Sequence, residues 1–310
     1  MTSITIMGSG VVGTATGMGF ARHGHAVSFV DIDASRIDAL RRAGCAASDQ
    51  VVLGDTPSII FLTLPTPNDG RHWNLDYIKA GTRAVGTALR ASKALHTVVV
   101  RSTVPPGTCD EVVRPILEEA AGRAVNEGFA LAANPEFLRA RSAYEDFLHP
   151  RMTVIGARSP RTLERLDDLL RPFGGELRRF TDPRTAELIK CTHNLFNATK
   201  ISFWNEVWEV SERLGLDAAA VAETVAISSE ASYNAGYGIS GGSPYGGACL
   251  PKDTKGFLGF AEALGVEVPM AAATDQVNER MLALATASVP EQADRLVRER
   301  ERASEELAAR

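Results

Sequence analysis

The residue with the clearest chemical potential is Cys249, in the segment GGACLPKD. A free cysteine is most often a buried small hydrophobic residue, but this one follows two glycines and precedes Pro251 and Lys252. Gly246 and Gly247 allow close approach to the backbone, and the lysine can stabilise a thiolate. From these residues alone, a core cysteine and a nucleophile are equally good interpretations.

A second candidate pair, Lys190 and Asn194, lies in LIKCTHNLF, four residues apart in a helical pattern and therefore on one helix face. A lysine here would otherwise direct its charge at an apolar surface, which favours a functional role.

A glycine-rich turn, GSGVVG, stands between a strand pattern and a helix pattern near the start of the chain. Gly8 permits the tight turn, Gly10 admits a pyrophosphate close to the backbone, and Gly13 lets helix and strand pack closely. The helix that begins at Val11 and Val12 supplies N–H donors and a favourable dipole for the anion. The turn therefore predicts a dinucleotide-binding site.

Asp31 supports that prediction, because it lies 18 residues beyond Gly13 at the predicted end of the second strand. A carboxylate at this place accepts hydrogen bonds from ribose hydroxyls and repels a 2′-phosphate, so NAD is predicted over NADP. Arg36 is close by and can weaken the preference, since an arginine accommodates the phosphate in NADP enzymes.

The elements that position these residues follow an alternating strand and helix pattern, typical of an α/β fold with a doubly wound parallel sheet. We predict a Rossmann-like NAD-binding domain over residues 1–182. Its later strands are expected at 58–65, 97–104, 129–137, 152–157 and 175–180, and its helices after the first at 35–43, 75–91 and 108–122.

From residue 183 the pattern changes to long helices without strands, which predicts a mostly helical domain over 183–290. A glycine-rich stretch at 235–248 interrupts it, and its Cys, Lys and Asp neighbours favour a functional loop. The charged residues 291–310 have few large apolar side chains, and we expect a solvated helix or a fraying end.

The bulk composition excludes several classes of protein. The formal charge is −5 and no basic run stands out before the C-terminus, which argues against nucleic-acid binding. No apolar stretch is long enough to cross a bilayer, and Ile4 and Ile6 run directly into the glycine turn without room for a signal peptide. Four cysteines without a CxxC pair predict neither a disulfide framework nor a metal site. We therefore expect a cytoplasmic protein.

Taken together, the motifs resemble the UDP-glucose/GDP-mannose 6-dehydrogenase family over nearly the whole chain. They occur in the family's order and at about its spacings, which makes the set specific although no single motif suffices. The segments are GSGVVG, FLTLPTP, VRSTVPPGT, NPEFLRARSAYEDF, HPRMTVIG, AELIKCTHNLFNATKISFWNEV and YGGACLPKD.

The resemblance implies a four-electron oxidation that consumes two NAD molecules. Cys249 matches the cysteine that attacks an aldehyde, formed by a first hydride transfer, to give a thiohemiacetal. A second hydride transfer then gives a thioester, which water cleaves. Lys190 and Asn194 match the pair that stabilises the alkoxide.

The resemblance also assigns supporting roles. Glu136 matches the glutamate of proton transfer and water activation, and Thr103 and Asp253 match groups that position the water. Asp253 can equally be a helix N-cap, with Pro251 before it. The residues that we expect to face the cofactor in this region are Thr66, Pro67, Ser102 and Thr103.

The sequence departs from the family's pattern in two places. Members usually continue into a third domain that grips the nucleotide, and with residues only to Arg310 we expect sugar nucleotides to be poor substrates. A second glutamate and a glycine of the family's PEFLREG pattern are Ala140 and Arg141 here. Arg141 is either a surface residue or a contact for an anionic group.

The sequence therefore predicts NAD-dependent oxidation of a primary alcohol of a sugar or sugar-like molecule to a carboxylate. The alternatives are a two-electron dehydrogenase of a hydroxy acid or alcohol, and a non-catalytic partner of a separate nucleotide-sugar-binding polypeptide. We also expect a homodimer, since the helices that carry Phe203, Trp204 and Trp208 have larger apolar faces than one small helical domain can bury.

Overall fold

The structure is a computed structural model that describes residues 1–68, 70–247 and 249–286. It divides into two compact units, residues 1–194 and the part that begins at Leu195, and each is described by itself. The predicted solvated tail, 291–310, lies outside the described residues. The division that we predicted at residue 182 stays a prediction.

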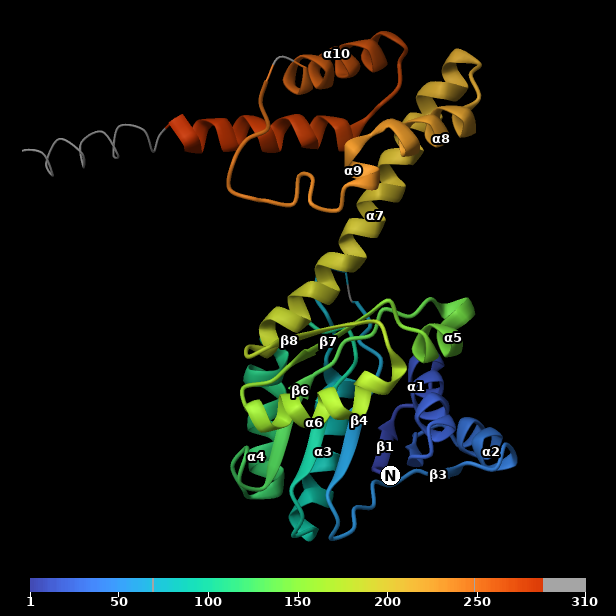
Figure 1. Ribbon diagram of the computed structural model, residues 1–310, viewed down its shortest axis with the longest axis vertical. Helices are drawn as coiled ribbons and strands as arrows, with labels where there is room; N and C mark the ends of the chain where they lie inside the picture. The colour runs from blue at the N-terminus through green and yellow to red at the C-terminus, as the bar shows by residue number, and fades with distance from the viewer. Residues whose placement is uncertain (69, 248, 287–310) are drawn as a thin grey trace, which may run out of the picture. The chain divides into compact units, whose positions relative to one another are not determined.

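An eight-stranded sheet forms the middle of the first unit, with the strand order β3-β2-β1-β4-β5-β6-β7-β8 (Figure 1). Neighbouring strands are parallel except β6 and β7, which are antiparallel. The chain order reverses between β1 and β4, so the carboxyl ends of these strands form the switch point where such sheets bind ligands. The strands are β1 (Ser3–Met7), β2 (Ala26–Val30), β3 (Ala46–Ser48), β4 (Ser58–Leu62), β5 (His96–Val100), β6 (Phe129–Ala133), β7 (Met152–Gly156) and β8 (Glu176–Phe180).

Helices cover both faces of this sheet. One apolar core lies beneath α1, α2, α5 and α6, where Phe20 and Phe147 pack edge to face at 5.1 Å, and a second lies beneath α3 and α4. These helices are α1 (Val11–Arg22), α2 (Ala34–Arg42), α3 (Asp76–Ala91), α4 (Arg114–Ala121), α5 (Ala143–Leu148) and α6 (Pro160–Leu170). The predicted doubly wound α/β fold is confirmed.

Two short elements and one strand direction differ from the sequence prediction. The strand β3 and the helix α5 were not predicted, because three and six residues are too few to show a period. The predicted helix at 108–122 begins as a π-helical turn over Cys109–Val113 before α4. The antiparallel direction of β7 is a tertiary property that an apolar run of five residues does not encode.

The second unit is helical, as predicted. It contains the end of α7 (Pro183–Leu214), then α8 (Ala218–Ser228), α9 (Glu230–Tyr233), α10 (Leu250–Ala263) and a helix at 269–286. A small apolar core joins Val210 to Val266 and Val268. Within the described ranges, no helix is both long and apolar enough to cross a membrane.

His96 is fully buried at the start of β5 and forms a hydrogen-bond chain. Its Nδ1 accepts from the Ser58 N–H at 3.2 Å, so its Nε2 donates to the Ser92 hydroxyl at 2.8 Å, which donates to the Gly54 carbonyl at 2.7 Å. This arrangement requires a neutral ring. Burial lowers the pKa of His96 below its ordinary 6.5, with a contribution from the charge of Arg165.

We predict that His96 makes the fold less stable in mild acid. The unfolded ring binds a proton near pH 6.5 and the folded ring binds it only at lower pH, so stability is complete above 6.5 and falls as the pH decreases. Between the pKa values of the unfolded and the folded ring, the free energy of unfolding should fall by up to about 1.4 kcal/mol for each pH unit. Denaturant unfolding from pH 7.5 to 5 measures it, with His96→Gln as the comparison. Equal slopes for the two proteins would contradict the assignment.

Candidate active site

The glycine turn of the first unit lies at the switch point, directly after β1. Gly8 has φ +95°, and a Cβ there would lie 2.6 Å from the Thr63 carbonyl oxygen. A Cβ on Gly13 would lie 1.9 Å from the Gly8 oxygen. A Cβ on Gly10 would have no protein atom within 4 Å. Packing therefore requires the first and third glycines, whereas close approach of a ligand accounts for the second.

The N-terminus of α1 faces a groove of about 790 Å³. Gly10 is the N-cap of this helix and offers no side-chain acceptor, so the first N–H groups have no side-chain cap. Val11 is exposed at the groove, and Val12 is half-buried. Such a helix start binds phosphate groups, and the residues present therefore fit a dinucleotide.

Asp31 follows β2 and is buried beside the turn. One carboxylate oxygen accepts from the Ser9 N–H and the Ser9 hydroxyl, both at 2.6 Å, and the other accepts from the Asp33 N–H at 3.0 Å. Burial alone would raise the pKa of Asp31, but these hydrogen bonds and the charge of Arg36, 3.6 Å away, lower it below its ordinary value. The carboxylate is therefore charged at neutral pH and repels a 2′-phosphate.

Asp31 is expected to decide the choice of cofactor. In Asp31→Ser the repulsion of a 2′-phosphate is removed and Arg36 loses one of its two carboxylate partners. The ratio of kcat/KM for NAD to kcat/KM for NADP should fall by about a hundredfold, which corresponds to roughly 2.7 kcal/mol. Steady-state kinetics with both cofactors measures the ratio. Equal efficiency of the unaltered protein with NADP would show that Arg36 dominates the pocket.

The loops after β4 and β5 meet beside the turn and hold the other residues predicted to face the cofactor. The Thr66 hydroxyl donates to the Thr103 carbonyl at 2.7 Å, and the Ser102 hydroxyl donates to the Leu64 carbonyl at 2.6 Å. Pro67 is exposed in the same loop as Thr66. Within the described ranges, the Thr103 hydroxyl makes no hydrogen bond, which leaves it available to a ligand or water.

Glu136 and Lys190 form a largely buried ion pair that joins the segment after β6 to α7. The Lys190 Nζ lies 3.1 Å from one Glu136 oxygen, and the other oxygen accepts from the Leu138 N–H at 2.6 Å. The two side chains are only 12% and 6% exposed, and the ammonium lies 5.4 Å from the centre of the Phe137 ring. A base and a cation are thus held together at the carboxyl ends of the strands.

Sequence reasoning missed Arg101, a buried cation in the strand end VVVRS. Its guanidinium donates to the Thr16 hydroxyl at 2.9 Å and to the Asn134 side chain at 2.6 Å. Burial lowers the pKa of Arg101 to about 10, which the negative charge of Glu136 opposes. Arg101 therefore fixes Asn134, two residues before Glu136. A charge directly after three valines was the available signal.

Glu187 was also missed, although it lies one turn before Lys190 on α7. Its carboxylate accepts from the Gly107 N–H at 2.6 Å and from the Cys109 N–H at 2.8 Å. Burial raises the pKa of Glu187, and these hydrogen bonds oppose the rise. The contact fixes the loop of Thr103 to the helix of Lys190.

The remaining predicted catalytic residues are Asn194, Cys249 and Asp253. Asn194, the last residue of the first unit, is exposed on α7, four residues after Lys190. Cys249 and Asp253 belong to the second unit, where Cys249 is exposed at the N-cap of α10. The alternative of Asp253 as the N-cap is wrong, since that residue lies in the first turn and pairs with Lys252 at 2.8 Å. Lys252 is thus engaged by a carboxylate.

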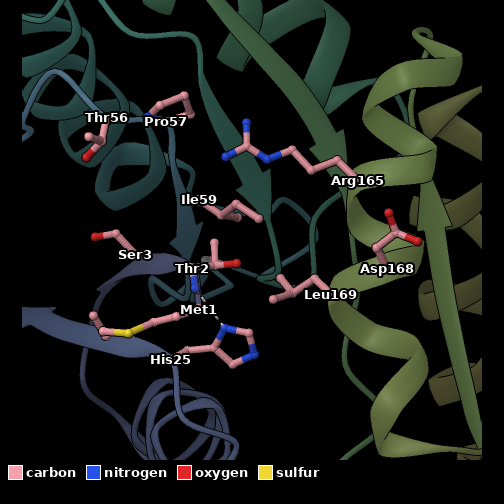
Figure 2. Close-up of a pocket in the computed structure, with 11 residues that line it drawn as sticks. Met1, Thr2, Ser3, His25, Thr56, Pro57, Ile59, Arg165, Asp168 and Leu169 are labelled. Atoms are coloured by element: carbon pink, nitrogen blue, oxygen red, sulfur yellow. Dashed lines mark hydrogen bonds between the residues drawn. The ribbon is translucent and has the colours of Figure 1, made fainter.

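A separate cavity of about 570 Å³ lies at the amino ends of β1, β2 and β4 (Figure 2). His25 Nδ1 accepts from the Thr2 N–H at 3.3 Å there, and the Arg165 side chain extends from α6. The Arg165 guanidinium is occupied by the carbonyls of Leu95 and Ser58. The cavity is at the amino ends of the strands, whereas the predicted site is at their carboxyl ends, where α/β sheets bind ligands.

Comparison with known proteins supports the family resemblance that the motifs indicate. The chain matches the NAD binding domain of the UDP-glucose/GDP-mannose dehydrogenase family over residues 2–56 and 49–174, and the central domain of that family over residues 184–280. The match to an NAD binding domain confirms the predicted cofactor, NAD.

Two curated relatives and one solved structure show the extent of the similarity. GDP-mannose 6-dehydrogenase of Pseudomonas aeruginosa is 32% identical over 86% of this chain and 66% of its own length. UDP-glucose 6-dehydrogenase AglM of Haloferax volcanii is 36% identical over 91% of this chain and 71% of its own. A crystal structure of a ternary complex of GDP-mannose dehydrogenase from P. aeruginosa has a TM-score of 0.84 at 30% identity, over 92% of this chain and 71% of that one.

The chain thus spans about two thirds of the length of the curated relatives that it matches. Both family domains are present in the family's order, the identity exceeds 30% over most of the chain, and the fold agrees with that of a solved member. The chain belongs to the UDP-glucose/GDP-mannose dehydrogenase family.

Proposed function

We propose that the protein oxidises a primary alcohol of a sugar or sugar-like substrate to a carboxylate, with NAD as the acceptor. The observation that carries the proposal is the buried Glu136–Lys190 pair, 3.1 Å apart. Burying two charges is costly unless they are paired, and a pair beside a cofactor site gives a base and an oxyanion partner at one place. The names of the relatives, GDP-mannose and UDP-glucose 6-dehydrogenases, support the sugar class.

The turn of Gly8, Gly10 and Gly13 with Asp31 would hold NAD, which supplies a hydride acceptor when bound. In the proposed first oxidation Glu136 takes the hydroxyl proton. The alcohol carbon loses a hydride and becomes the aldehyde carbon. Lys190 and Asn194 stabilise the negative charge on the oxygen during this step.

In the proposed second oxidation the Cys249 sulfur adds to the aldehyde carbon, and the thiol proton passes to the carbonyl oxygen to give a thiohemiacetal. This adduct then loses its hydroxyl proton to solvent and a hydride to a second NAD, which gives a thioester. Glu136 releases the proton of the first oxidation to solvent before it acts again. Water, positioned by Thr103 and Asp253 and deprotonated by Glu136, then cleaves the C–S bond. The products are the carboxylate and the free thiol. The exposure of Cys249 at the start of α10 makes its sulfur accessible to a substrate, which supports this role.

The proposal is tested by incubating the purified protein with NAD and free sugars, glycosides, sugar phosphates, UDP-glucose and GDP-mannose. We expect NADH from at least one of these compounds and a carboxylate as the organic product. Absence of NADH with every class, in a protein shown to bind NADH, would overturn the proposal.

A two-electron dehydrogenase is the second candidate. It is favoured because Glu136 and Lys190 both lie in the first unit, and a single hydride transfer needs no cysteine from the second. The carbonyl compound would then be the final product. The product analysis of the same incubation separates the two functions.

We further propose that the chain forms a homodimer through its helical unit. The side chains of Phe196, Ile201 and Trp208 on α7 are 67%, 63% and 53% exposed, while Trp204 is half-buried. Exposed apolar residues at this density mark protein contacts. Light scattering at micromolar concentration should give twice the mass of the chain. A single-chain mass would contradict the prediction.

A further inference from the structure

The groove beside the glycine turn has a second wall, which the cofactor motif alone does not explain. One wall is the start of α1, with Ser9, Gly10 and Val11. The other is the segment after Leu138, which forms a 3-10 turn over Ala140–Ser142 and continues into α5. This wall contains Ala140 and Arg141, where the family's pattern has glutamate and glycine. Relative to the family's pattern, the groove therefore lacks one acidic residue and gains one basic residue.

Three arginines near this groove differ in whether they are already engaged. Arg139 donates to Asp146 with its Nη2 at 2.6 Å and its Nε at 3.1 Å. Arg36 lies 3.6 Å from Asp31 and 3.5 Å from Asp33. Arg141 has neither a hydrogen bond nor an ion pair within the described ranges, and it is exposed. It is the guanidinium of the three that can bind a new anion without breaking a contact.

The chemistry of the groove identifies the anion. Arg36 lies beside Asp31, which is the ribose end of the site, whereas Arg141 lines the same groove as the start of α1 and is not paired with Asp31 in the described part of the chain. Those N–H groups bind the pyrophosphate in a dinucleotide site. Glu145 lines the same groove without pairing with either arginine in the described part of the chain, so its charge limits the groove's net positive charge but does not neutralise the guanidinium.

We propose that Arg141 binds the pyrophosphate of the cofactor in the groove that it shares with the start of α1. The proposal rests on the proposed NAD-dependent function. A guanidinium forms bidentate hydrogen bonds with phosphate oxygens, and its charge adds to the helix dipole. In this chain the loop after Glu136 thus holds the cofactor with a cation that the glycine of the family's pattern does not provide.

The test measures the binding of four ligands to the full chain: NADH, NADPH, ADP and adenosine. Arg141→Ala should raise the Kd of NADH, NADPH and ADP by about tenfold and leave that of adenosine unchanged, because adenosine is the only one of the four without a pyrophosphate. The increase should shrink at high salt, since the contact is partly exposed. Arg141→Lys should recover part of the affinity, because it keeps the charge and loses the bidentate geometry.

Arg83→Ala is the matched control, since this exposed arginine lies on α3, away from the groove, and has no ion pair within the described ranges. It should leave all four Kd values unchanged. Unaltered NADH and ADP binding in Arg141→Ala, with or without a higher KM for the substrate, would overturn the proposal. A loss confined to NADPH would also overturn it, by placing the guanidinium at the 2′-phosphate. Failure of the unaltered protein to bind NADH would instead refute the proposed function.

Discussion

Replacement of Cys249 by serine should lower carboxylate production by a factor on the order of 10³ or more and leave NADH binding unchanged. The reason is that a hydroxyl is a weak nucleophile without a dedicated base, so the aldehyde is not converted to a covalent adduct. Product should stop at the aldehyde after at most one hydride transfer. Aldehyde trapping with a hydrazine and chromatography of the acid product measure the two outcomes separately.

The matched control for this variant is Cys45→Ser. Cys45 is a half-buried thiol whose sulfur lies 3.6 Å from that of Met18, and it has no place in the proposed chemistry. The control should retain carboxylate production. Carboxylate formation by Cys249→Ser at the rate of the unaltered protein would show that the covalent route is wrong.

The second large effect is expected at the Glu136–Lys190 pair. Lys190→Met leaves a buried carboxylate without its cation, so the free energy of unfolding should fall by roughly 3–5 kcal/mol. Loss of a partner for the alkoxide should also lower kcat by about 10²–10³. Glu136→Gln keeps an acceptor for the Leu138 N–H and removes the base, so it should lower kcat with a smaller loss of stability.

The double variant separates stability from chemistry. With methionine and glutamine together, no unpaired charge remains buried, and stability should recover relative to Lys190→Met while activity stays low. Lys200→Met is the control, because this exposed lysine lies on the same helix and has no ion pair in the described ranges. Stability loss in Lys190→Met without loss of kcat would limit the pair to a structural role.

The sequence predicted those parts of the site that depend on local rules. Gly8 and Gly13 were predicted because a tight turn and a close helix contact tolerate no side chain, and Asp31 because a strand end fixes its place relative to the turn. The Lys190–Asn194 spacing needed only a helix. The layered fold followed from alternating patterns of apolar residues.

The parts that sequence could not predict depend on contacts between distant segments. The ion pair of Glu136 with Lys190 joins the segment after β6 to α7, and neither residue's neighbours in the sequence predict the other. Arg101 directly follows β5 and contacts Asn134 after β6 and Thr16 on α1. Both partners are neutral, so no complementary charge marks them in the sequence. Asn194 and Cys249 belong to different units, and their cooperation stays a prediction.

Whether the oxidation removes four electrons is measured by counting NADH per molecule of substrate consumed and identifying the organic product. The substrate identified in the screen is converted to completion with excess NAD, and NADH absorbance is compared with the acid measured by chromatography. We expect a ratio of two, with the acid as the product and no free aldehyde accumulating. One NADH per molecule of substrate consumed, with the carbonyl compound as the final product, would contradict the four-electron oxidation and establish the two-electron dehydrogenase.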